Sequence, residues 1–326
     1  MKYGTVGTSI ITNNFIEAAR EQGSLTLVGV YSREEEKAKD FAKQNGAAYY
    51  YTDLEEMAKS DKLDCVYIAS PNSLHFEQVK LFLEHKKHVI CEKPIFSNLK
   101  ELHAAYEVAK ENDVFLFEAM RNLYMPGFQS LKENVEKVGK LRSAIWSYSK
   151  YSSRYNKVRN GEEPNIFSRK FSGGALVDLG VYPLSAAIAL FGRPDQVSYS
   201  PVIIDTGVDG GGTLVLRYPE FICTILCSKI TTTYNLSEIQ GEDGTIIIND
   251  IGSFSEVKLK DIHTLEEKVI FENQSHHDMY YEIDQFVQII QSDDQEKYQT
   301  IQTISQEVLR ITEKVRNENG IIFGVE

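Results

Sequence analysis

The first third of the chain alternates short apolar runs with charged, amphipathic segments. This alternation predicts repeated strand-helix units that build a parallel sheet. The predicted strands are Lys2 to Val6, Leu25 to Tyr31, Ala48 to Tyr51, Asp64 to Ala69, His88 to Cys91 and Val114 to Glu118. The predicted helices lie near Ile10 to Gln22, Arg33 to Gln44, Leu54 to Lys59, Leu74 to Glu84 and Leu99 to Lys110.

Local signals mark the ends of several of these helices. Gly46 stands where a helix C-terminus favours a positive φ angle. Asp53 and Ser73 are predicted N-caps, and Asn98 with Glu101 has the spacing of a capping box.

The second half of the chain follows a different pattern. Residues Leu141 to Ser149 alternate like a half-buried strand, and the chain from Val197 onward is rich in strands. Thr213 to Tyr218 and Phe221 to Ser228 are predicted to form a hairpin, and two amphipathic helices, near 278–290 and 297–316, close the chain. We therefore expect an α/β protein with a parallel-sheet domain at residues 1–120 and an α+β domain, mainly antiparallel, at residues 121–326.

Composition narrows the class of protein. The 326 residues carry 35 Lys and Arg against 47 Asp and Glu, a net charge of -12, which argues against nucleic-acid and anionic-membrane partners. We see neither a leader-like N-terminus nor an apolar run near 18 residues, so the expected location is the cytoplasm. The four cysteines lack metal-ligand spacing and are interpreted as buried thiols, and adjacent His276 and His277 lack a partner at helical spacing, so no metal site is predicted.

The stretch Glu92-Lys93-Pro94 follows the strand beginning at His88. Proline disfavours helical geometry at Lys93, so the ammonium should leave the carboxyl end of the strand, which is the ligand-binding edge of an open parallel sheet. A solvated lysine before a turn is the alternative. The remaining motifs of the chain favour a role in chemistry.

Two further turns fall on the same predicted edge. Gly7-Thr8-Ser9-Ile10 follows the first strand and opens a helix, where a dinucleotide pyrophosphate could rest on backbone N–H groups. Ser9 and Thr12 stand where the usual fingerprint has glycines, so an ordinary turn is the competing interpretation. After the fourth strand, Ser70-Pro71-Asn72 leads towards His75 beside the expected path of the cofactor.

The end of the second strand bears on the choice of dinucleotide. Enzymes that use NAD place an acid there for the ribose hydroxyl, whereas this chain has Ser32 and Arg33. A hydroxyl and a guanidinium suit a 2'-phosphate, so we infer NADP, with NAD possible. Alternatively Arg33 is a solvated residue, and the acids at 34–36 would oppose a bound phosphate.

Polar and aromatic residues gather in an irregular segment and the helix after it. In the segment from Tyr151 to Ser172, Tyr151 and Asn165 could bond a polyol, although a solvated loop explains them equally well. Gly173-Gly174 then turns into a helix that carries Asp178 and Tyr182 at i and i+4, on one face. Local pairing of Asp178 and core packing of Tyr182 are the structural alternatives.

Five motifs occur in a fixed order and carry a family resemblance. They are Gly7-Thr8-Ser9, Ser70-Pro71-Asn72-Ser73-Leu74-His75, Glu92-Lys93-Pro94, Glu118-Ala119-Met120 and the glycine-led run from Gly173 to Pro183. Together they resemble the glucose-fructose oxidoreductase / inositol dehydrogenase (Gfo/Idh/MocA) family. Gly207-Val208-Asp209 and the stretch from Gly241 to Ile246 are similar to its dihydrodiol dehydrogenase / xylose dehydrogenase branch.

The resemblance implies a Rossmann domain followed by a domain with an open, mainly antiparallel sheet. It also implies that Lys93 and Asp178 are catalytic. Most members have a histidine four residues after the aspartate, whereas this chain has Tyr182, as that branch does. Arg121-Asn122 stands where the branch usually has Trp-Thr, and we take these two residues as candidate substrate contacts.

These observations predict an NAD(P)-dependent dehydrogenase that moves a hydride between the cofactor and a sugar, polyol or dihydrodiol CH–OH group. Tyr182 would exchange the hydroxyl proton, Lys93 would stabilise the phenolate and Asp178 would orient Lys93 or the substrate. Glu92 would shape the turn near the nicotinamide. A homodimer formed through the broad sheet is expected. A dinucleotide sensor without turnover, or a hydrolase or lyase with transient oxidation, is the alternative.

Overall fold

The computed structural model describes residues 1–272 and 275–326, which form two compact units. Unit 1 comprises Met1–Ala119 and His276–Ser305, and unit 2 comprises Met120–Ser275 and Gln306–Glu326. The chain thus leaves unit 1, returns to it and leaves again. This division differs from a single cut at residue 120, because the segment His276–Ser305 packs with the N-terminal residues.

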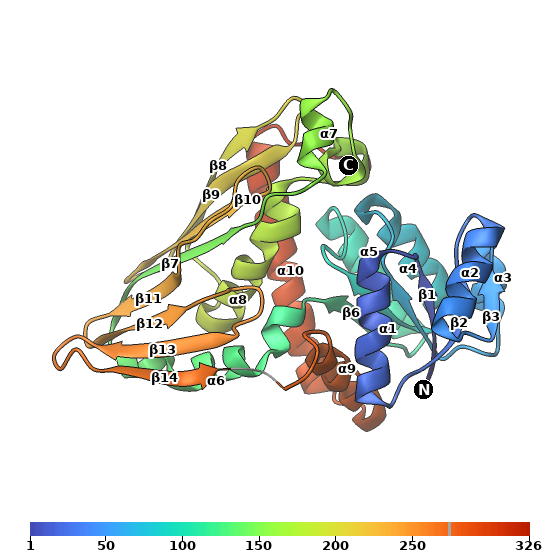
Figure 1. Cartoon of the computed structure of the whole chain (residues 1–326), viewed down its shortest axis with the longest axis horizontal. Coiled ribbons are helices and arrows are strands. Elements are labelled where there is room, and N and C mark those ends of the chain that lie inside the picture. The colour runs from blue at the N-terminus through green and yellow to red at the C-terminus, as the bar shows by residue number, and fades with distance from the viewer. Residues whose placement is uncertain (273–274) are drawn as a thin grey trace. The chain divides into compact units, whose positions relative to one another are not determined.

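Unit 1 contains a six-stranded sheet in the order β3-β2-β1-β4-β5-β6, with all neighbouring strands parallel (Figure 1). The strands are β1 (Lys2–Val6), β2 (Thr26–Tyr31), β3 (Tyr49–Tyr51), β4 (Cys65–Ile68), β5 (His88–Glu92) and β6 (Leu116–Ala119). This order reverses between β1 and β4, as in a Rossmann domain. The prediction of a parallel N-terminal sheet is confirmed.

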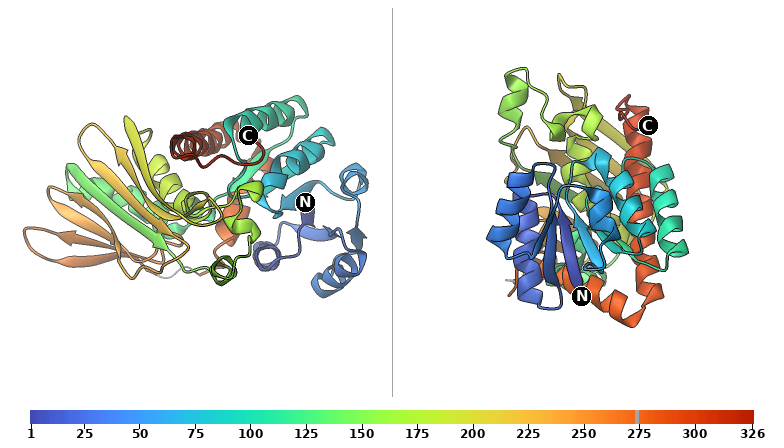
Figure 2. Two further views of the ribbon diagram at one scale, coloured as in Figure 1. Left: turned by 90° about the horizontal axis from the view of Figure 1, so that it is seen from above. Right: turned by 90° about the vertical axis from the view of Figure 1, so that its right-hand side faces the viewer.

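Helices cover both faces of this sheet (Figure 2). They are α1 (Ile10–Gln22), α2 (Glu35–Asn45), α3 (Leu54–Lys59), α4 (His75–Glu84), α5 (Leu99–Glu111) and α9 (Tyr280–Ser292). Ile16 of α1, Val30 of β2 and Phe41 of α2 form one buried cluster. On β6, Phe117 stacks on Phe286 of α9 with ring centroids 4.4 Å apart, so α9 completes the core of unit 1.

The predicted helix ends are mostly confirmed. Gly46 has φ +68°, Asp53 accepts a hydrogen bond from the Glu56 amide, and Asn98 accepts one from the Glu101 amide. The predicted cap at Ser73 is wrong. Ser73 lies in a 3-10 turn (Asn72–Leu74) that the Leu74 N–H closes onto the Pro71 carbonyl, so α4 begins only at His75.

Unit 2 contains an eight-stranded sheet in the order β14-β13-β12-β11-β7-β10-β9-β8. The strands are β7 (Leu141–Ser149), β8 (Gln196–Ile203), β9 (Asp209–Arg217), β10 (Ile222–Ser228), β11 (Ser237–Gly241), β12 (Gly244–Ile248), β13 (Glu256–Asp261) and β14 (Glu267–Glu272). β7 and β10 run parallel, and the other neighbours run antiparallel. The predicted hairpin and the mainly antiparallel second sheet are confirmed.

The helices of unit 2 are α6 (Pro126–Asn134), the short α7 (Tyr155–Arg159) and α8 (Val181–Phe191), preceded by a π-helical turn (Leu176–Gly180). The last helix, α10 (Gln295–Glu318), contributes residues to both units. The expectation that no apolar run approaches 18 residues is wrong, because the helical stretch Arg169–Phe191 is long and apolar enough to cross a membrane; 72% of its apolar window, however, is buried in the protein. Helices at the core of a soluble protein share these properties.

Candidate active site

The carboxyl edge of the unit 1 sheet gathers several predicted site residues. Gly7 follows β1, Ser70 follows β4 and Lys93 follows β5, and these three strands are neighbours in the sheet. The Ala69 N–H donates to the Val6 carbonyl at 2.9 Å, which ties the two loops together. The edge lies at the reversal of strand order, where parallel sheets bind ligands.

The turn after β1 fits a bound pyrophosphate. Gly7 has φ +116°, and a Cβ there would lie 2.8 Å from the Ala69 carbonyl oxygen, so only glycine lets the chain turn here. Ser9 is the N-cap residue of the 13-residue α1, yet its side chain makes no capping hydrogen bond. Ile10 is 79% exposed although it is apolar. The backbone N–H groups at a helix N-terminus bind phosphate. This uncapped terminus, with an exposed apolar side chain beside it, is therefore suited to a dinucleotide.

The end of β2 presents a cation without an acid directly opposed to it. Arg33 is exposed, and within residues 1–272 and 275–326 no ion pair involves it. Of the acids that follow, Glu35 and Glu36 lie 3.0 and 3.4 Å from the Lys39 ammonium. Lys39 thus partly neutralises both carboxylates. The two carboxylates therefore repel a phosphate at Arg33 less than the sequence alone suggests.

His75 is fully buried and connects two loops of the edge. Its Nδ1 lies 3.0 Å from the Pro94 carbonyl oxygen and its Nε2 lies 3.0 Å from the Ser70 carbonyl oxygen. Burial lowers the pKa of the imidazole, and the three nearby backbone carbonyls oppose that shift. The ring therefore lies between the Ser70 loop and the Lys93-Pro94 turn, and its expected contact with the cofactor stays a prediction.

Two buried carboxylates flank Lys93. Glu92 accepts a 2.5 Å hydrogen bond from the Tyr67 hydroxyl, and Glu118 of β6 accepts one at 3.0 Å from the Ile95 amide. Burial raises the pKa of Glu118, while the Lys93 charge acts to lower it. Glu118 thus anchors the turn that carries Lys93. The sequence showed Glu118 only as part of a motif, and its role depends on the pairing of β5 with β6.

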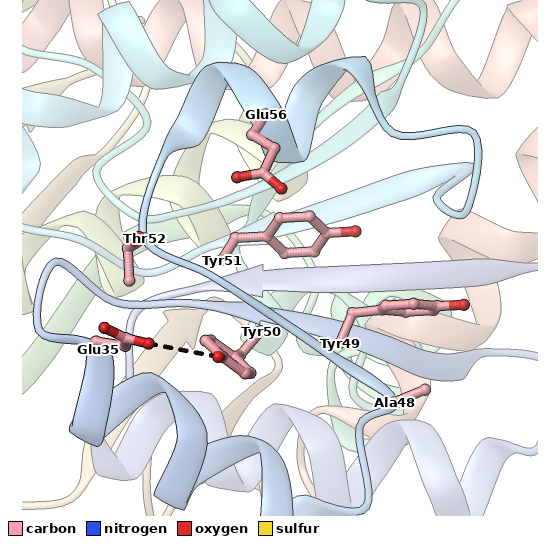
Figure 3. A pocket seen from close by; sticks show the side chains of 7 residues that line it. All are labelled: Glu35, Ala48, Tyr49, Tyr50, Tyr51, Thr52 and Glu56. Carbon is pink, nitrogen blue, oxygen red and sulfur yellow. Dashed lines mark hydrogen bonds between the residues drawn. The ribbon is translucent and has the colours of Figure 1, made fainter.

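A pocket of about 460 Å³ lies elsewhere on unit 1, along the edge strand β3 (Figure 3). Residues 48–52, Glu35 and Glu56 line it, and the Tyr50 hydroxyl donates to Glu35 at 3.4 Å. None of these residues is a predicted site residue, but the pocket adjoins the predicted 2'-phosphate contacts, because the Ser32 N–H donates to the Tyr51 carbonyl oxygen at 3.2 Å.

In unit 2, Asp178 lies in the π-helical turn and pairs with a residue that the sequence analysis did not select. The Lys229 ammonium, just after β10, donates to the Asp178 carboxylate. The Lys229 side chain is 6% exposed and that of Asp178 is 28% exposed. A lysine at a strand end looks solvated in a sequence, and only the neighbouring position of β10 and this turn reveals the pair.

Tyr182 lies in the first turn of α8 and is 6% exposed. Its ring packs edge-on against Tyr148, and the Arg121 guanidinium lies 5.5 Å from its centroid. Asn122 is fully buried and donates to the carbonyl oxygens of Tyr182 and Ile251 at 2.9 and 3.3 Å. Its amide therefore supports the backbone at Tyr182, and the expected contact of Asn122 with a substrate stays a prediction.

The remaining two candidates lie on the irregular segment of unit 2. Tyr151 is 41% exposed, and its hydroxyl donates to Asn156 at 2.7 Å. Asn165 is exposed at the start of a 3-10 turn. Both side chains are accessible, and their contact with a substrate remains a prediction. All four cysteines are buried free thiols, as predicted.

Two family models match the chain in succession. Residues 1–120 match the model described as "Oxidoreductase family, NAD-binding Rossmann fold", and residues 128–247 match the "GFO/IDH/MocA C-terminal domain". The resemblance inferred from the five motifs is thereby confirmed.

Similar proteins of known name extend over most of the chain. The scyllo-inositol 2-dehydrogenase (NADP(+)) IolU of Bacillus subtilis is 40% identical over 99% of this chain and 98% of its own length. A trans-1,2-dihydrobenzene-1,2-diol dehydrogenase of Danio rerio is 29% identical over 76% of this chain and 73% of its own.

A solved structure shows the same fold at lower identity. The 3-ketoreductase KijD10 of Actinomadura kijaniata superposes with a TM-score of 0.82 at 21% identity, covering 96% of this chain and 97% of that one. With two matching family models and a 40% identical relative along its whole length, the chain belongs to the Gfo/Idh/MocA family of NAD(P)-dependent oxidoreductases, which act on CH–OH groups.

Proposed function

We propose that this oxidoreductase oxidises a CH–OH group of a cyclic polyol or a related sugar and prefers NADP. The observation that carries the proposal is the 40% identity with an NADP-dependent scyllo-inositol dehydrogenase over nearly the whole of both chains. The exposed Arg33 at the end of β2 supports the choice of cofactor, since a guanidinium binds phosphate oxygens in a forked geometry.

Residues at the carboxyl edge of the unit 1 sheet would hold the cofactor. Its pyrophosphate would take the backbone N–H groups of the turn Gly7-Thr8-Ser9-Ile10, and its 2'-phosphate would take Ser32 and Arg33. The loop Ser70-Pro71-Asn72, fixed by His75, would line its path, and Glu92 would hold the turn that bears Lys93. When bound, the cofactor supplies the hydride acceptor.

Three side chains would handle the proton and the charge. Tyr182 would take the hydroxyl proton of the substrate during oxidation and return it during reduction. A phenol is a poor base at neutral pH unless a cation stabilises its phenolate, and Lys93 supplies that cation in this proposal. Asp178 would accept a hydrogen bond from a substrate hydroxyl. Arg121, Tyr151 and Asn165 are candidates for further substrate contacts.

We infer that the protein is a cytoplasmic homodimer. The unit 2 sheet exposes Ile145 of β7 (41% exposed) and Ile222 of β10 (46% exposed). Ile145 pairs with Thr224 and Ile222 pairs with Ser143, so both isoleucines lie on one face of adjacent strands. These two exposed isoleucines on one face of the sheet support a protein-protein interface there.

The first experiment is a panel of inositols, aldoses and dihydrodiols with NADP+ and with NAD+, followed by the appearance of reduced nicotinamide. We expect turnover with a cyclic polyol and a higher kcat/KM with NADP+. Product formation without any net change in nicotinamide absorbance would contradict hydride transfer and favour a hydrolase or lyase with transient oxidation. Cofactor binding with no product from any substrate would favour a sensor.

The second experiment tests Lys93. The variant Lys93→Met should bind NADPH nearly as the wild type does and should lose activity by about 100- to 10,000-fold, because a positioned acid-base group is worth that much. Lys87→Met is the matched control at the other end of β5, where Lys87 donates to the Ser60 carbonyl. It should stay within about twofold of the wild type. Turnover of Lys93→Met within tenfold of the wild type would defeat the assigned role.

A further inference from the structure

Lys229 is a buried lysine that contacts the segment carrying Asp178. Its side chain is 6% exposed, and its ammonium donates to the Asp178 carboxylate. The same ammonium lies 5.6 Å from the centroid of the Phe167 ring. A charged amine is costly to bury unless a counter-charge and hydrogen bonds compensate for the lost water. The carboxylate of Asp178 supplies that counter-charge.

The backbone fixes Lys229 on both sides. Its N–H donates to the Gly210 carbonyl of β9, and its carbonyl accepts from the Ser152 N–H, both at 2.8 Å. These bonds continue the sheet pairing beyond the last residue of β10. The backbone of Lys229 is therefore held by the sheet, and the ammonium does not extend from a mobile loop.

The Asp178 segment is held at a second point. The Leu176 N–H, at the first position of the π-helical turn, donates to the Asp209 carboxylate of β9 at 2.7 Å. Lys229 then binds the Asp178 side chain two residues later. A π-turn is uncommon and recurs at functional sites, where surrounding contacts must hold it.

We propose that Lys229 is a positioning residue for the oxidoreductase reaction, fixing the Asp178 carboxylate for a substrate hydroxyl. This inference rests on the role proposed above for Asp178. Because Lys229 is 6% exposed and Asp178 is 28% exposed, the carboxylate is the member of the pair that a substrate can reach. Lys229 acts through it, since its ammonium donates a hydrogen bond to that carboxylate.

The first test compares three single variants with the panel polyol of highest kcat/KM. Lys229→Met should lower kcat/KM by at least about tenfold with the dissociation constant of NADPH unchanged within about twofold. Lys229→Arg keeps the charge and should recover most of that loss. Lys258→Met is the matched control, because Lys258 is also paired on the sheet, with Glu256 and Glu267, and should behave as the wild type.

The second test asks whether Lys229 acts through Asp178. Asp178→Asn should lower kcat/KM, and adding Lys229→Met to it should change kcat/KM by no more than about twofold, since residues that act as one unit are not additive. Full additivity, or a Lys229→Met variant within twofold of the wild type, would overturn the inference. If Lys229→Met does not fold, a folded Lys229→Arg that is as inactive as Asp178→Asn overturns it equally.

The outcome for Asp178→Asn separates this inference from the proposed function. Wild-type activity in Asp178→Asn would remove the role proposed for Asp178, and the role of Lys229 would fall with it. An inactive Asp178→Asn beside a fully active Lys229→Met would leave the proposed function in place and remove only the role of Lys229.

Discussion

Arg33 is the residue that we propose distinguishes the two nicotinamide dinucleotides in this chain. The acids that follow it could repel a phosphate, but Glu35 and Glu36 contact Lys39, and Glu35 also accepts from the Tyr50 hydroxyl. The hydroxyl of Ser32 accepts a hydrogen bond from the Glu34 amide at 3.4 Å. Lys39 and Tyr50 therefore engage the acids in the first turn of α2. The Arg33 guanidinium remains available to an anion.

The variant Arg33→Asp should move the cofactor preference from NADP towards NAD. We expect the ratio of kcat/KM with NADP+ to kcat/KM with NAD+ to fall by about 10- to 100-fold, since a charge-assisted hydrogen bond is worth about 1.5–3 kcal/mol. Arg159→Asp, at the exposed end of α7, makes the same charge change and should leave the ratio unaltered. An unchanged ratio in Arg33→Asp would remove the 2'-phosphate argument.

Asp209 is a buried carboxyl whose environment makes stability depend on pH. Its Oδ2 accepts from the Tyr199 hydroxyl and the Leu176 amide, while Oδ1 accepts from no described residue. Burial raises its pKa from 3.8 to about 6. Between these two values the folded protein holds the proton and the unfolded chain has lost it, so this group makes the folded state less stable as the pH rises from about 4 to 6.

Asp209→Asn should remove that dependence. Relative to the wild type, the variant should become more stable between pH 4 and pH 7, by up to about 3 kcal/mol for a shift of this size. Thermal unfolding of both proteins at a series of pH values measures the difference. A constant difference in unfolding temperature across the series would show that Asp209 does not titrate in this window.

Among individual residues, the sequence identified those that end a strand or open a helix. Gly7, Lys93 and Asp178 could be selected because turn chemistry and position along the chain mark them. The contacts that fix them could not be predicted: His75 was selected only as a residue beside the cofactor and Lys229 was not selected, because these contacts join elements that meet only in the folded chain. The same holds for Asn122, whose amide serves two backbone carbonyls far along the chain.

The turn into the Asp178 segment requires a glycine at position 174. Gly174 has φ +139°, and a Cβ built there would lie 2.2 Å from Asp209 Oδ1. Gly161 also has a positive φ, +83°, but nothing lies within 4 Å of its Cβ position. A side chain at either position would strain the backbone. Only at Gly174 would it also clash with the buried carboxylate of Asp209.

Gly174→Ala should therefore destabilise the protein more than Gly161→Ala does. Strain at a positive φ costs about 1–3 kcal/mol, and the conflict with Asp209 adds to it only at Gly174. We expect Gly174→Ala to lower the unfolding temperature further and to reduce kcat, because the Asp178 turn must shift. Equal unfolding temperatures for the two variants would contradict this account.

The elements of the parallel sheet were more predictable than the helical turn at Asp178. All six predicted strands occur, most with ends shifted by one or two residues, because buried strands read as continuous apolar runs. Reasoning from i and i+4 placed Asp178 and Tyr182 on one α-helical face, whereas residues Leu176–Gly180 form a π-turn. Asp209 and Lys229 hold this turn through contacts that the local sequence does not encode.

The two units each depend on residues far apart in the chain. In unit 1, Phe117 of β6 stacks on Phe286, and the Tyr298 hydroxyl accepts a hydrogen bond from the Leu116 amide. The amphipathic pattern of residues 278–290 predicted a helix but could not indicate which core that helix would cover. A boundary drawn at residue 120 omits this helix from the N-terminal domain.

A fragment of residues 1–120 should therefore fail to form a stable domain. It would expose Phe117, which is fully buried in the whole chain, and would leave the β6 amide of Leu116 without its partner. We expect binding of a hydrophobic dye and no cooperative thermal transition. Joining residues 1–119 to 276–305 through a flexible linker should restore the transition, and a cooperative fragment 1–120 would refute this expectation.

The return of the chain to unit 1 at His276 has a consequence for biosynthesis. All six strands of the parallel sheet leave the ribosome before any of unit 2, yet α9, which covers β6, is made only after the intervening segment Met120–Ser275. At roughly 5–20 residues per second, that delay is on the order of ten to thirty seconds. The nascent chain thus spends this interval with an aromatic surface awaiting its cover, and chaperones that bind such surfaces would act during that interval.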